Sequence, residues 1–437
     1  MRASIGVWAV AASAMAAVAV SGCTPVLAPS LPRGRVLPSV RSPAGDARYA
    51  VLLPSSLPAG RRAPIVFAFD PDGQGARAAE RLARAAEAGG AIVVASNDSQ
   101  NGPIEPTARA MEAMWRDARL LPAHPLRFVA AGFSGGARAA LVMAERHPAH
   151  FDGVIAVGAA QPPGGRMPRL GRGALVIVVG ELDFNLGEAL AVERAARAGA
   201  ITTPVWVEVI AGGHAWAPPE VLARGLAFLQ ATSGPAEAKR RWLDERLARA
   251  RADEAAGEWP RALSAYRQLA RIAVDEGARA AAAEAEARLR AGRAEAIDAL
   301  EAMAPASLED RAAVERALLA ARRVGGGADP VARRAAGVLA TLPPLVLLHA
   351  IALARDGRPD AARAWLALVD GDRPSDAATA YNLGCARALL GDEEAASAAL
   401  REAIARGFRD RAHLVADPDL TAFLETPAGR AILALLR

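Results

Sequence analysis

The pattern of apolar and polar residues divides the chain into two regions. Between residues 46 and 232, short apolar runs rich in Val, Ile and Phe alternate with longer segments whose apolar residues recur at helical spacing. This alternation predicts an α/β fold with a mostly parallel sheet. The predicted strands span residues 48–53, 65–69, 91–96, 127–132, 153–157, 175–179 and 205–210, and the predicted helices span residues 75–89, 106–121, 135–145, 187–198 and 218–229.

The second region, residues 236–437, has no strand pattern. Ala, Leu, Arg and Glu recur there at helical spacing, and Gly and Pro separate the segments, which predicts an all-α domain. Gly357 and Gly391 are 34 residues apart, and Ala or Leu residues around them recur at the same offset. This spacing indicates a helical repeat. A generic Ala-rich bundle is the alternative, and the Gly-rich residues 324–327 interrupt the period and leave the number of repeats open.

The first residues of the chain have the pattern of a secretory signal. One charge, Arg2, precedes the uncharged and mostly apolar residues 5–20. The segment closes on Val20-Ser21-Gly22-Cys23, which resembles the lipobox of bacterial lipoproteins. The resemblance implies that residues 1–22 are a cleaved signal peptide and that Cys23 carries the lipid that anchors the protein to a membrane. An ordinary signal peptide followed by an incidental cysteine is the alternative.

These features predict an exported protein that faces the periplasm or lies on the cell surface. Residues 23–45 contain several Pro, Ser and Gly residues and are predicted to form a flexible tether. Cys385 is the only other cysteine. Lipidation of Cys23 therefore leaves no pair for an intramolecular disulfide.

Composition excludes several classes of protein. Hydrophobic residues make up 52% of the chain, enough for a sizeable core, so a disordered or fibrous protein is excluded. The net charge of +5 comes from arginines that are dispersed among Ala and Glu, and only 4% of residues are aromatic. Nucleic-acid binding is therefore not expected.

Candidate catalytic chemistry lies at the carboxyl ends of three predicted strands. Gly132-Phe133-Ser134-Gly135-Gly136 connects a strand to a helix and has the G-x-S-x-G pattern, which exposes a serine on a tight turn. Asp183 follows the strand at 175–179, and His214 follows the strand at 205–210. Parallel strands bring their carboxyl ends together, so we predict a Ser134–His214–Asp183 triad. Glu181 is the rival acid, and Asp152 is a weaker one because it precedes its strand.

The elbow and the Gly-Gly-His sequence at residues 212–214 resemble the α/β-hydrolase superfamily, in particular secreted esterases related to polyhydroxybutyrate depolymerases and feruloyl esterases. The resemblance covers residues 45–232 and implies ester hydrolysis through an acyl-enzyme. The sequence has no phosphate-cradling loop and no cluster of metal ligands, so no cofactor is expected. Asp72-Gly73 stands where many such esterases carry His-Gly. This alignment with His-Gly implies that the backbone N–H groups of Gln74 and Gly135 form the oxyanion hole.

Other residues near the predicted strand ends are candidates for a substrate pocket. Asn97 follows the strand at 91–96, where it could line the pocket or form a hydrogen-bonded turn, and Trp216 follows His214, where it could form a wall or cap a helix. The six histidines are dispersed, so no metal site is predicted.

The helical region has a resemblance of its own. Asn382-Leu383-Gly384, followed by Gly391 and Ala396, resembles a tetratricopeptide repeat, which implies a protein or peptide partner. The sequence as a whole therefore predicts an anchored, exported serine hydrolase for carboxylic esters. A peptidase of the same fold, or a non-catalytic lipoprotein adaptor that acts through its repeats, is the alternative.

Overall fold

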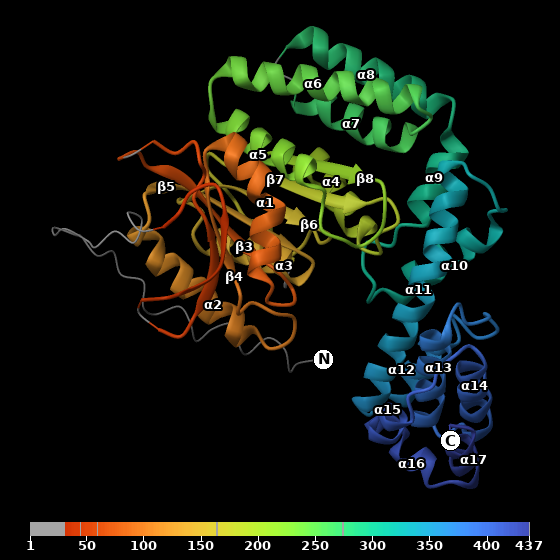
Figure 1. Ribbon diagram of the computed structural model, residues 1–437. Coiled ribbons are helices and arrows are strands. Elements are labelled where there is room, and N and C mark those ends of the chain that lie inside the picture. Colours follow the sequence, from red (N-terminus) through yellow and green to blue (C-terminus); the bar gives the residue numbers. More distant parts are fainter. Residues whose placement is uncertain (1–30, 44, 59, 163–164, 273–274, 437) are drawn as a thin grey trace.

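The computed structural model describes residues 31–43, 45–58, 60–162, 165–272 and 275–436. The predicted signal peptide, Cys23 and the first part of the predicted tether lie outside the described residues. Within them, a sheet with helices on both faces is followed by a long helical region (Figure 1).

The sheet contains eight strands in the order β1-β2-β4-β3-β5-β6-β7-β8. β1 pairs antiparallel with β2, and β2 pairs antiparallel with β4, whereas all the remaining pairs are parallel. The mostly parallel sheet and its flanking helices fit the α/β-hydrolase fold. The strand bounds are β1 Val36–Arg41, β2 Arg48–Leu52, β3 Ala63–Phe69, β4 Ile92–Ser96, β5 Ala123–Phe133, β6 Phe151–Val157, β7 Ala174–Gly180 and β8 Val205–Ile210.

β1 lies inside the segment predicted to be a flexible tether, so that prediction is corrected for residues 36–41. Val36 and Leu37 are paired with Leu52 and Val51 of β2, at the edge of the sheet. An edge strand tolerates proline because one side of it makes no ladder hydrogen bonds. Pro38 lies at the irregularity in this pairing, and its presence hid the strand from the sequence pattern.

Helices cover both faces of the sheet because its central strands are apolar throughout. Every residue of β6 and β7 is buried, as parallel strands between two helical layers require. α1 (Gly75–Gly89) and α5 (Pro219–Ser233) pack on one face. α2 (Ile104–Asp117), α3 (Gly135–Arg146) and α4 (Leu186–Arg197) pack on the other.

The helical region starts by covering the free edge of β8. α6 (Ala236–Ala255) continues from α5, and α7 (Trp259–Ile272) lies against β8. The Gln268 side chain accepts a hydrogen bond from the Val207 N–H and donates one to the Val207 carbonyl at 2.7 Å. Arg271 donates to the Val205 carbonyl at 2.8 Å. These side chains satisfy backbone groups that an uncovered edge strand would leave open to association.

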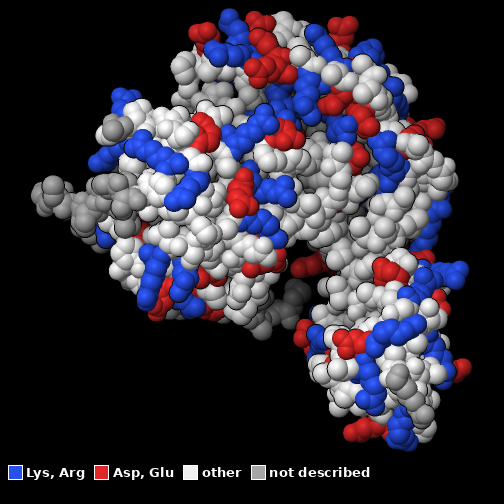
Figure 2. Space-filling model, viewed as in Figure 1, with Lys and Arg blue, Asp and Glu red and all other residues white. Residues whose placement is uncertain are grey.

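From α8 onward the chain descends beside the α/β part and ends in a second helical lobe (Figure 1). An open notch separates this lobe from the α/β part (Figure 2). On the face of the molecule that Figure 2 shows, positive and negative side chains are interspersed. The helices are α8 Glu276–Ala291, α9 Ala294–Ala302, α10 Arg311–Arg323, α11 Pro330–Arg355, α12 Pro359–Leu366, α13 Ala377–Leu389, α14 Glu393–Ala405, α15 Arg411–Ala416, α16 Thr421–Leu424 and α17 Pro427–Leu435.

α11 connects the two ends of the helical region. Among the described residues it is the one helix long and apolar enough to cross a membrane, with a mean hydropathy of 2.0 over 18 residues. It packs against α10, α12 and α13, and 44% of that stretch is buried. A core helix of a water-soluble domain has these same properties, so length and composition do not identify α11 as a membrane span.

The two glycines of the 34-residue spacing occupy equivalent turns. Gly357 lies between α11 and α12, Gly391 lies between α13 and α14, and their φ angles are +69° and +75°. This left-handed conformation favours glycine at the end of a helix. Gly384 allows α13 to approach α14 closely, because a Cβ there would lie 2.7 Å from Leu400 Cγ. Two helix pairs therefore repeat at the predicted spacing.

Candidate active site

Ser134 lies on a strained turn between β5 and α3. Its φ of 54° and ψ of −121° make it the one non-glycine residue with positive φ in the described part of the chain. Strain of this kind costs roughly 1–3 kcal/mol and persists only where the surroundings impose it. Gly132 and Gly136 make the turn sterically possible, because a Cβ at either residue would lie 2.2 Å from a backbone oxygen.

The structure brings the three predicted triad residues together. His214 Nε2 lies 2.9 Å from Ser134 Oγ, and His214 Nδ1 lies 3.0 Å from Asp183 Oδ2 and 3.1 Å from Oδ1. A histidine that donates its Nδ1–H to the carboxylate has Nε2 free to accept the serine proton. Asp183 is 1% exposed, whereas His214 retains 20% exposure of its side chain, so the imidazole is reachable from solvent.

The rival acids have other partners. Glu181 lies between Arg261 and Arg333, at 3.6 and 3.8 Å, and Asp152 pairs with Arg127 at 3.0 Å. Arginines thus engage both carboxylates, whereas His214 Nδ1 contacts Asp183. The geometry therefore favours Asp183 as the acid.

Neighbours that the sequence did not reveal hold Asp183 and His214. The Asn185 N–H donates to Asp183 Oδ1 at 2.8 Å, and the Asn185 side chain donates to the Gly158 carbonyl at 2.7 Å. The rings of Phe184 and Phe133 lie 4.3 and 4.7 Å from the His214 ring. The only sequence signal for Phe184 and Asn185 is their position directly after Asp183.

The two predicted oxyanion donors have different environments. Gly135 is the first residue of α3, and the N–H of that position has no acceptor within the helix, so it is available to a ligand. The Gln74 N–H instead faces Asp70 Oδ1 at 3.4 Å, so it is less available than the Gly135 N–H to donate to an oxyanion. The Asn101 side chain lies over the elbow, since a Cβ at Gly135 would be 1.8 Å from Asn101 Oδ1.

A buried carboxylate, Asp70, connects the loop after β3 with the loop that carries His214. It is fully buried and accepts hydrogen bonds from Arg77 at 2.8 and 3.0 Å, from Trp216 Nε1 at 2.8 Å and from the Asp72 N–H at 2.9 Å. Burial raises the pKa of Asp70, but these hydrogen bonds outweigh it, so the pKa lies below its ordinary value of 3.8. Trp216 therefore ties two loops together, besides packing on Phe133.

We expect Asp70→Asn to lower the free energy of unfolding by roughly 2 kcal/mol at neutral pH, because hydrogen bonds to a charged group are lost. The folded-state pKa lies below 3.8, so this contribution is present above pH 3.8 and is lost as the pH falls through the folded value. Urea unfolding of parent and variant at several pH values measures it. The exposed neighbour is the control: Asp72→Asn should leave stability almost unchanged. A difference for Asp70→Asn that is constant with pH would contradict the assignment.

The structure places Asn97 beside the loop that carries Gln74, where a Cβ at Gly75 would lie 2.6 Å from Asn97 Oδ1, and not in hydrogen-bonding contact with Ser134, Asp183 or His214. Its side chain donates to the Pro38 carbonyl at 2.9 Å and so holds the edge strand β1. A cavity of about 170 Å³ instead adjoins Asn101 and Gly135, with an apolar lining from Ile104, Met111 and Val142. Asn101, four residues after Asn97 in the same polar segment, is the residue nearer to the nucleophile.

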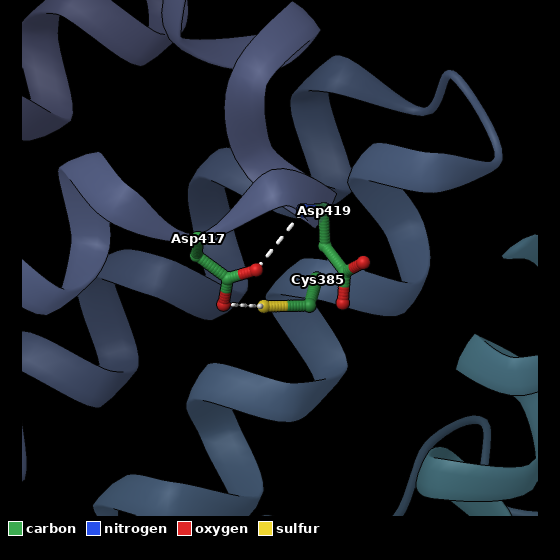
Figure 3. Close-up of side chains that lie close together, drawn as sticks. All are labelled: Cys385, Asp417 and Asp419. Atoms are coloured by element: carbon green, nitrogen blue, oxygen red, sulfur yellow. Dashed lines mark hydrogen bonds between the residues drawn. The ribbon is translucent and has the colours of Figure 1, made fainter.

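A cluster of potential metal ligands lies far along the chain, in the C-terminal lobe (Figure 3). The Asp417 carboxylate accepts hydrogen bonds from Tyr381 at 2.8 Å and from the Cys385 thiol at 3.7 Å, and Asp419 pairs with Arg355 at 2.6 and 2.8 Å. Burial and the Asp417 charge raise the pKa of Cys385, so the thiol is neutral. With its donors engaged in this way, the cluster is better explained as a link between α13 and the following helices than as a cation site.

Comparisons with known proteins found no matching family model and no similar curated protein. Solved structures that resemble part of the chain include an esterase from the archaeon Pyrobaculum calidifontis, with 13% identity over 46% of this chain and 85% of that one, at a TM-score of 0.36. An S-formylglutathione hydrolase from Staphylococcus aureus shows 15% identity over 45% and 97%, at 0.36. A ferulic acid esterase shows 19% over 45% and 98%, at 0.35.

Proposed function

We propose that this chain is a serine hydrolase that cleaves carboxylic esters through an acyl-enzyme. The observation that carries the proposal is the continuous hydrogen-bonded chain from Ser134 Oγ through His214 to Asp183, on a nucleophile elbow with positive φ. A turn serine or a loop histidine with only a structural role has no need of this strained geometry. The mechanism follows from the positions of these groups.

In the first half-reaction, Ser134 Oγ attacks the ester carbonyl carbon while His214 Nε2 takes the hydroxyl proton. Asp183 stabilises the imidazolium that forms, and the oxyanion accepts a hydrogen bond from the Gly135 N–H at the positive end of α3. The tetrahedral intermediate then breaks its bond to the alkoxide. The alkoxide leaves as an alcohol with the proton from His214, and the acyl group stays on Ser134.

Water completes the reaction. His214 removes a proton from a water molecule, whose oxygen attacks the acyl carbonyl, and the second tetrahedral intermediate expels Ser134 Oγ. The proton returns from His214 to Ser134, and a carboxylic acid is released.

The Gly135 N–H is the principal donor to the oxyanion. The Gln74 N–H faces Asp70 and would have to turn away from it to act as the second donor.

The cavity beside the elbow supports a compact apolar group as part of the substrate. Its volume is about 170 Å³, and Ile104, Met111 and Val142 contribute to its wall. Arg138 also lines it, but its guanidinium is held by Glu188 at 2.8 and 3.0 Å. We therefore propose an ester that has a compact aliphatic or aromatic group next to the elbow.

The proposal extends to location and partner. Export and lipid anchoring through Cys23 rest on the sequence of residues 1–23. A tetratricopeptide-like role for the helical region is supported by the two helix pairs that repeat at 34 residues. A groove of about 260 Å³, lined in part by Leu339, Leu347 and Leu383, is the candidate site for a peptide or protein partner.

A fluorophosphonate probe tests the catalytic proposal directly. We expect the purified full chain to be labelled covalently, because the probe reacts with an activated serine, and Ser134→Ala to abolish the labelling. Ser56→Ala is the matched control and should keep the labelling, because Ser56 is exposed and its hydroxyl contacts the Glu87 carbonyl at 3.5 Å rather than a histidine. A folded parent that stays unlabelled would overturn the proposal. Matched ester and amide substrates then separate an esterase from a peptidase.

A further inference from the structure

The loop that carries Asp183, residues 181–185, is held by the helical region as well as by the sheet. We call it the acid loop. Arg334 of α11 donates through Nη1 to the Glu181 carbonyl at 3.0 Å and to the Asp183 carbonyl at 3.3 Å. Its Nη2 donates to the Met303 carbonyl, after α9, at 2.7 Å. One guanidinium therefore joins the acid loop to two parts of the helical region.

Packing brings the same elements together. Leu182 of the acid loop lies against Gly337 of α11, where a Cβ would be 2.8 Å from Leu182 Cδ2. Gly187, at the start of α4, faces the Pro305 carbonyl, 2.0 Å from the position of a Cβ. Phe184 contacts His214 on one side and packs against the apolar core around α10 and α11 on the other. The acid loop and the start of α4 therefore pack directly against the helical region at both glycines.

The guanidinium of Arg334 is buried, which is costly for a charged group. The residue is 4% exposed, and burying a guanidinium is costly unless its donors are satisfied. The Arg334 Nη1 and Nη2 have backbone acceptors, whereas its Nε has no hydrogen-bond partner among the described residues. Burial lowers the pKa of Arg334 to about 10, against the opposing attraction of Asp183 and Glu181, so the side chain is charged at neutral pH. A cavity of about 90 Å³ also adjoins the acid loop, next to Leu182 and Leu186. The loop is therefore not fully supported by side-chain packing on that side.

We propose that Arg334 is a positioning residue for the reaction: its hydrogen bonds to the acid loop hold the Asp183 carboxylate against His214, so the helical region completes the active site. The inference rests on the proposed function. It assigns to α11 a role in the rate of the chemical step, in addition to any partner that the helical region binds. Arg334 makes this contact from about 150 residues further along the chain than Asp183.

Three variants of the full chain test this. Arg334→Met removes the hydrogen bonds, Arg334→Lys keeps a buried charge with fewer donors, and Arg322→Met is the matched control. Arg322 also donates to a backbone carbonyl, that of Leu368 at 2.9 Å, but within the helical region and away from the acid loop. Ester kinetics, thermal unfolding and the downfield proton NMR resonance of the His214 Nδ1–H are measured for each.

We expect Arg334→Met to lower kcat by roughly 10- to 100-fold with little change in KM, since a displacement of about 1 Å in a catalytic group has effects of this size. The His214 resonance should shift upfield or broaden. Arg334→Lys should show a smaller loss in the same direction, and it decides the question if Arg334→Met does not fold. Arg322→Met should keep both the rate and the resonance.

Unchanged kcat and an unchanged resonance in a folded Arg334 variant would overturn the inference, as would an equal loss in Arg322→Met. The proposed function fails by a different result, namely a parent chain that neither hydrolyses esters nor reacts with the fluorophosphonate. In that case the resonance still reports whether Arg334 holds Asp183 against His214. The two failures are therefore distinguishable.

Discussion

Replacing Asp183 by Asn should lower kcat for ester hydrolysis by about 10⁴, while KM changes little. The two Asp183 oxygens accept from His214 Nδ1 at 3.0 and 3.1 Å, and this contact fixes the imidazole with a lone pair on Nε2. An asparagine can present its NH₂ group to Nδ1 and thereby stabilise the other tautomer. Nε2 then carries the proton, faces Ser134 Oγ as a donor, and cannot accept the serine proton. Steady-state kinetics with a chromogenic ester measures the loss.

The rival acid is the control for this experiment. Glu181→Gln should change kcat less than about threefold, because the Glu181 side chain pairs with Arg261 and Arg333 rather than with His214. It has the same change of charge, two residues away in the same loop. A large loss in Glu181→Gln together with an active Asp183→Asn would show that the triad has a different acid from the one the geometry indicates.

The grouping of Ser134, His214 and Asp183 at one edge of the sheet could be predicted from sequence, because each residue has a strong local signal. A fully apolar run such as β7 fixes a central strand, and the first polar residues after it must lie at the carboxyl edge of the sheet. Gly132, Ser134 and Gly136 add the pattern of a turn whose geometry excludes side chains on either side of the serine. The strand pattern and the chemistry of a catalytic triad therefore indicate the same three residues.

The rest of the site depends on contacts between distant segments, which have no local pattern. Trp216 meets Asp70 across 146 residues, and Arg334 meets Asp183 across 151. Each of these residues has an ordinary neighbourhood in the sequence: Arg334 is one of many arginines on Ala-rich helices. Asn97 and Asn101 show the same limit at short range: the sequence analysis selected Asn97 as the pocket residue, whereas Asn101 of the same polar segment lies over the elbow.

The helical region packs against the α/β region and is not only connected to it by the chain. Gln268 and Arg271 satisfy the backbone of β8, and the Trp242 ring packs 4.8 Å from the Trp206 ring of that strand. The sequence predicted a boundary near residues 233–235, and the change from strands to helices does occur there. The helical region nevertheless packs tightly on the α/β region across this boundary, because it covers both the edge of β8 and the acid loop.

Gly136→Ala should disrupt the nucleophile elbow. A Cβ at this position would lie 2.2 Å from the Phe69 carbonyl oxygen and 2.6 Å from the Phe69 carbonyl carbon, and these backbone atoms belong to the central strand β3. They cannot rotate away as a side chain would, so α3 or β3 must shift. Overpacking of a core typically costs about 1–3 kcal/mol, and a shift of Ser134 by about 1 Å would cost roughly 100-fold in rate. Thermal unfolding and the rate of fluorophosphonate labelling measure the two effects.

The direction of this effect opposes helix propensity, which makes the prediction specific to the elbow. Alanine in place of glycine in a helix ordinarily stabilises by roughly 0.5–1 kcal/mol, so a loss at Gly136 has to come from the steric contact with Phe69. Gly292→Ala is the control: its φ is −85° and a Cβ would be 3.8 Å from the Arg288 carbonyl oxygen, an ordinary contact. That variant should unfold within a few degrees of the parent and label at the parent rate. If Gly136→Ala behaved in the same way, the packing between β3 and the elbow would have to be looser than the structure indicates.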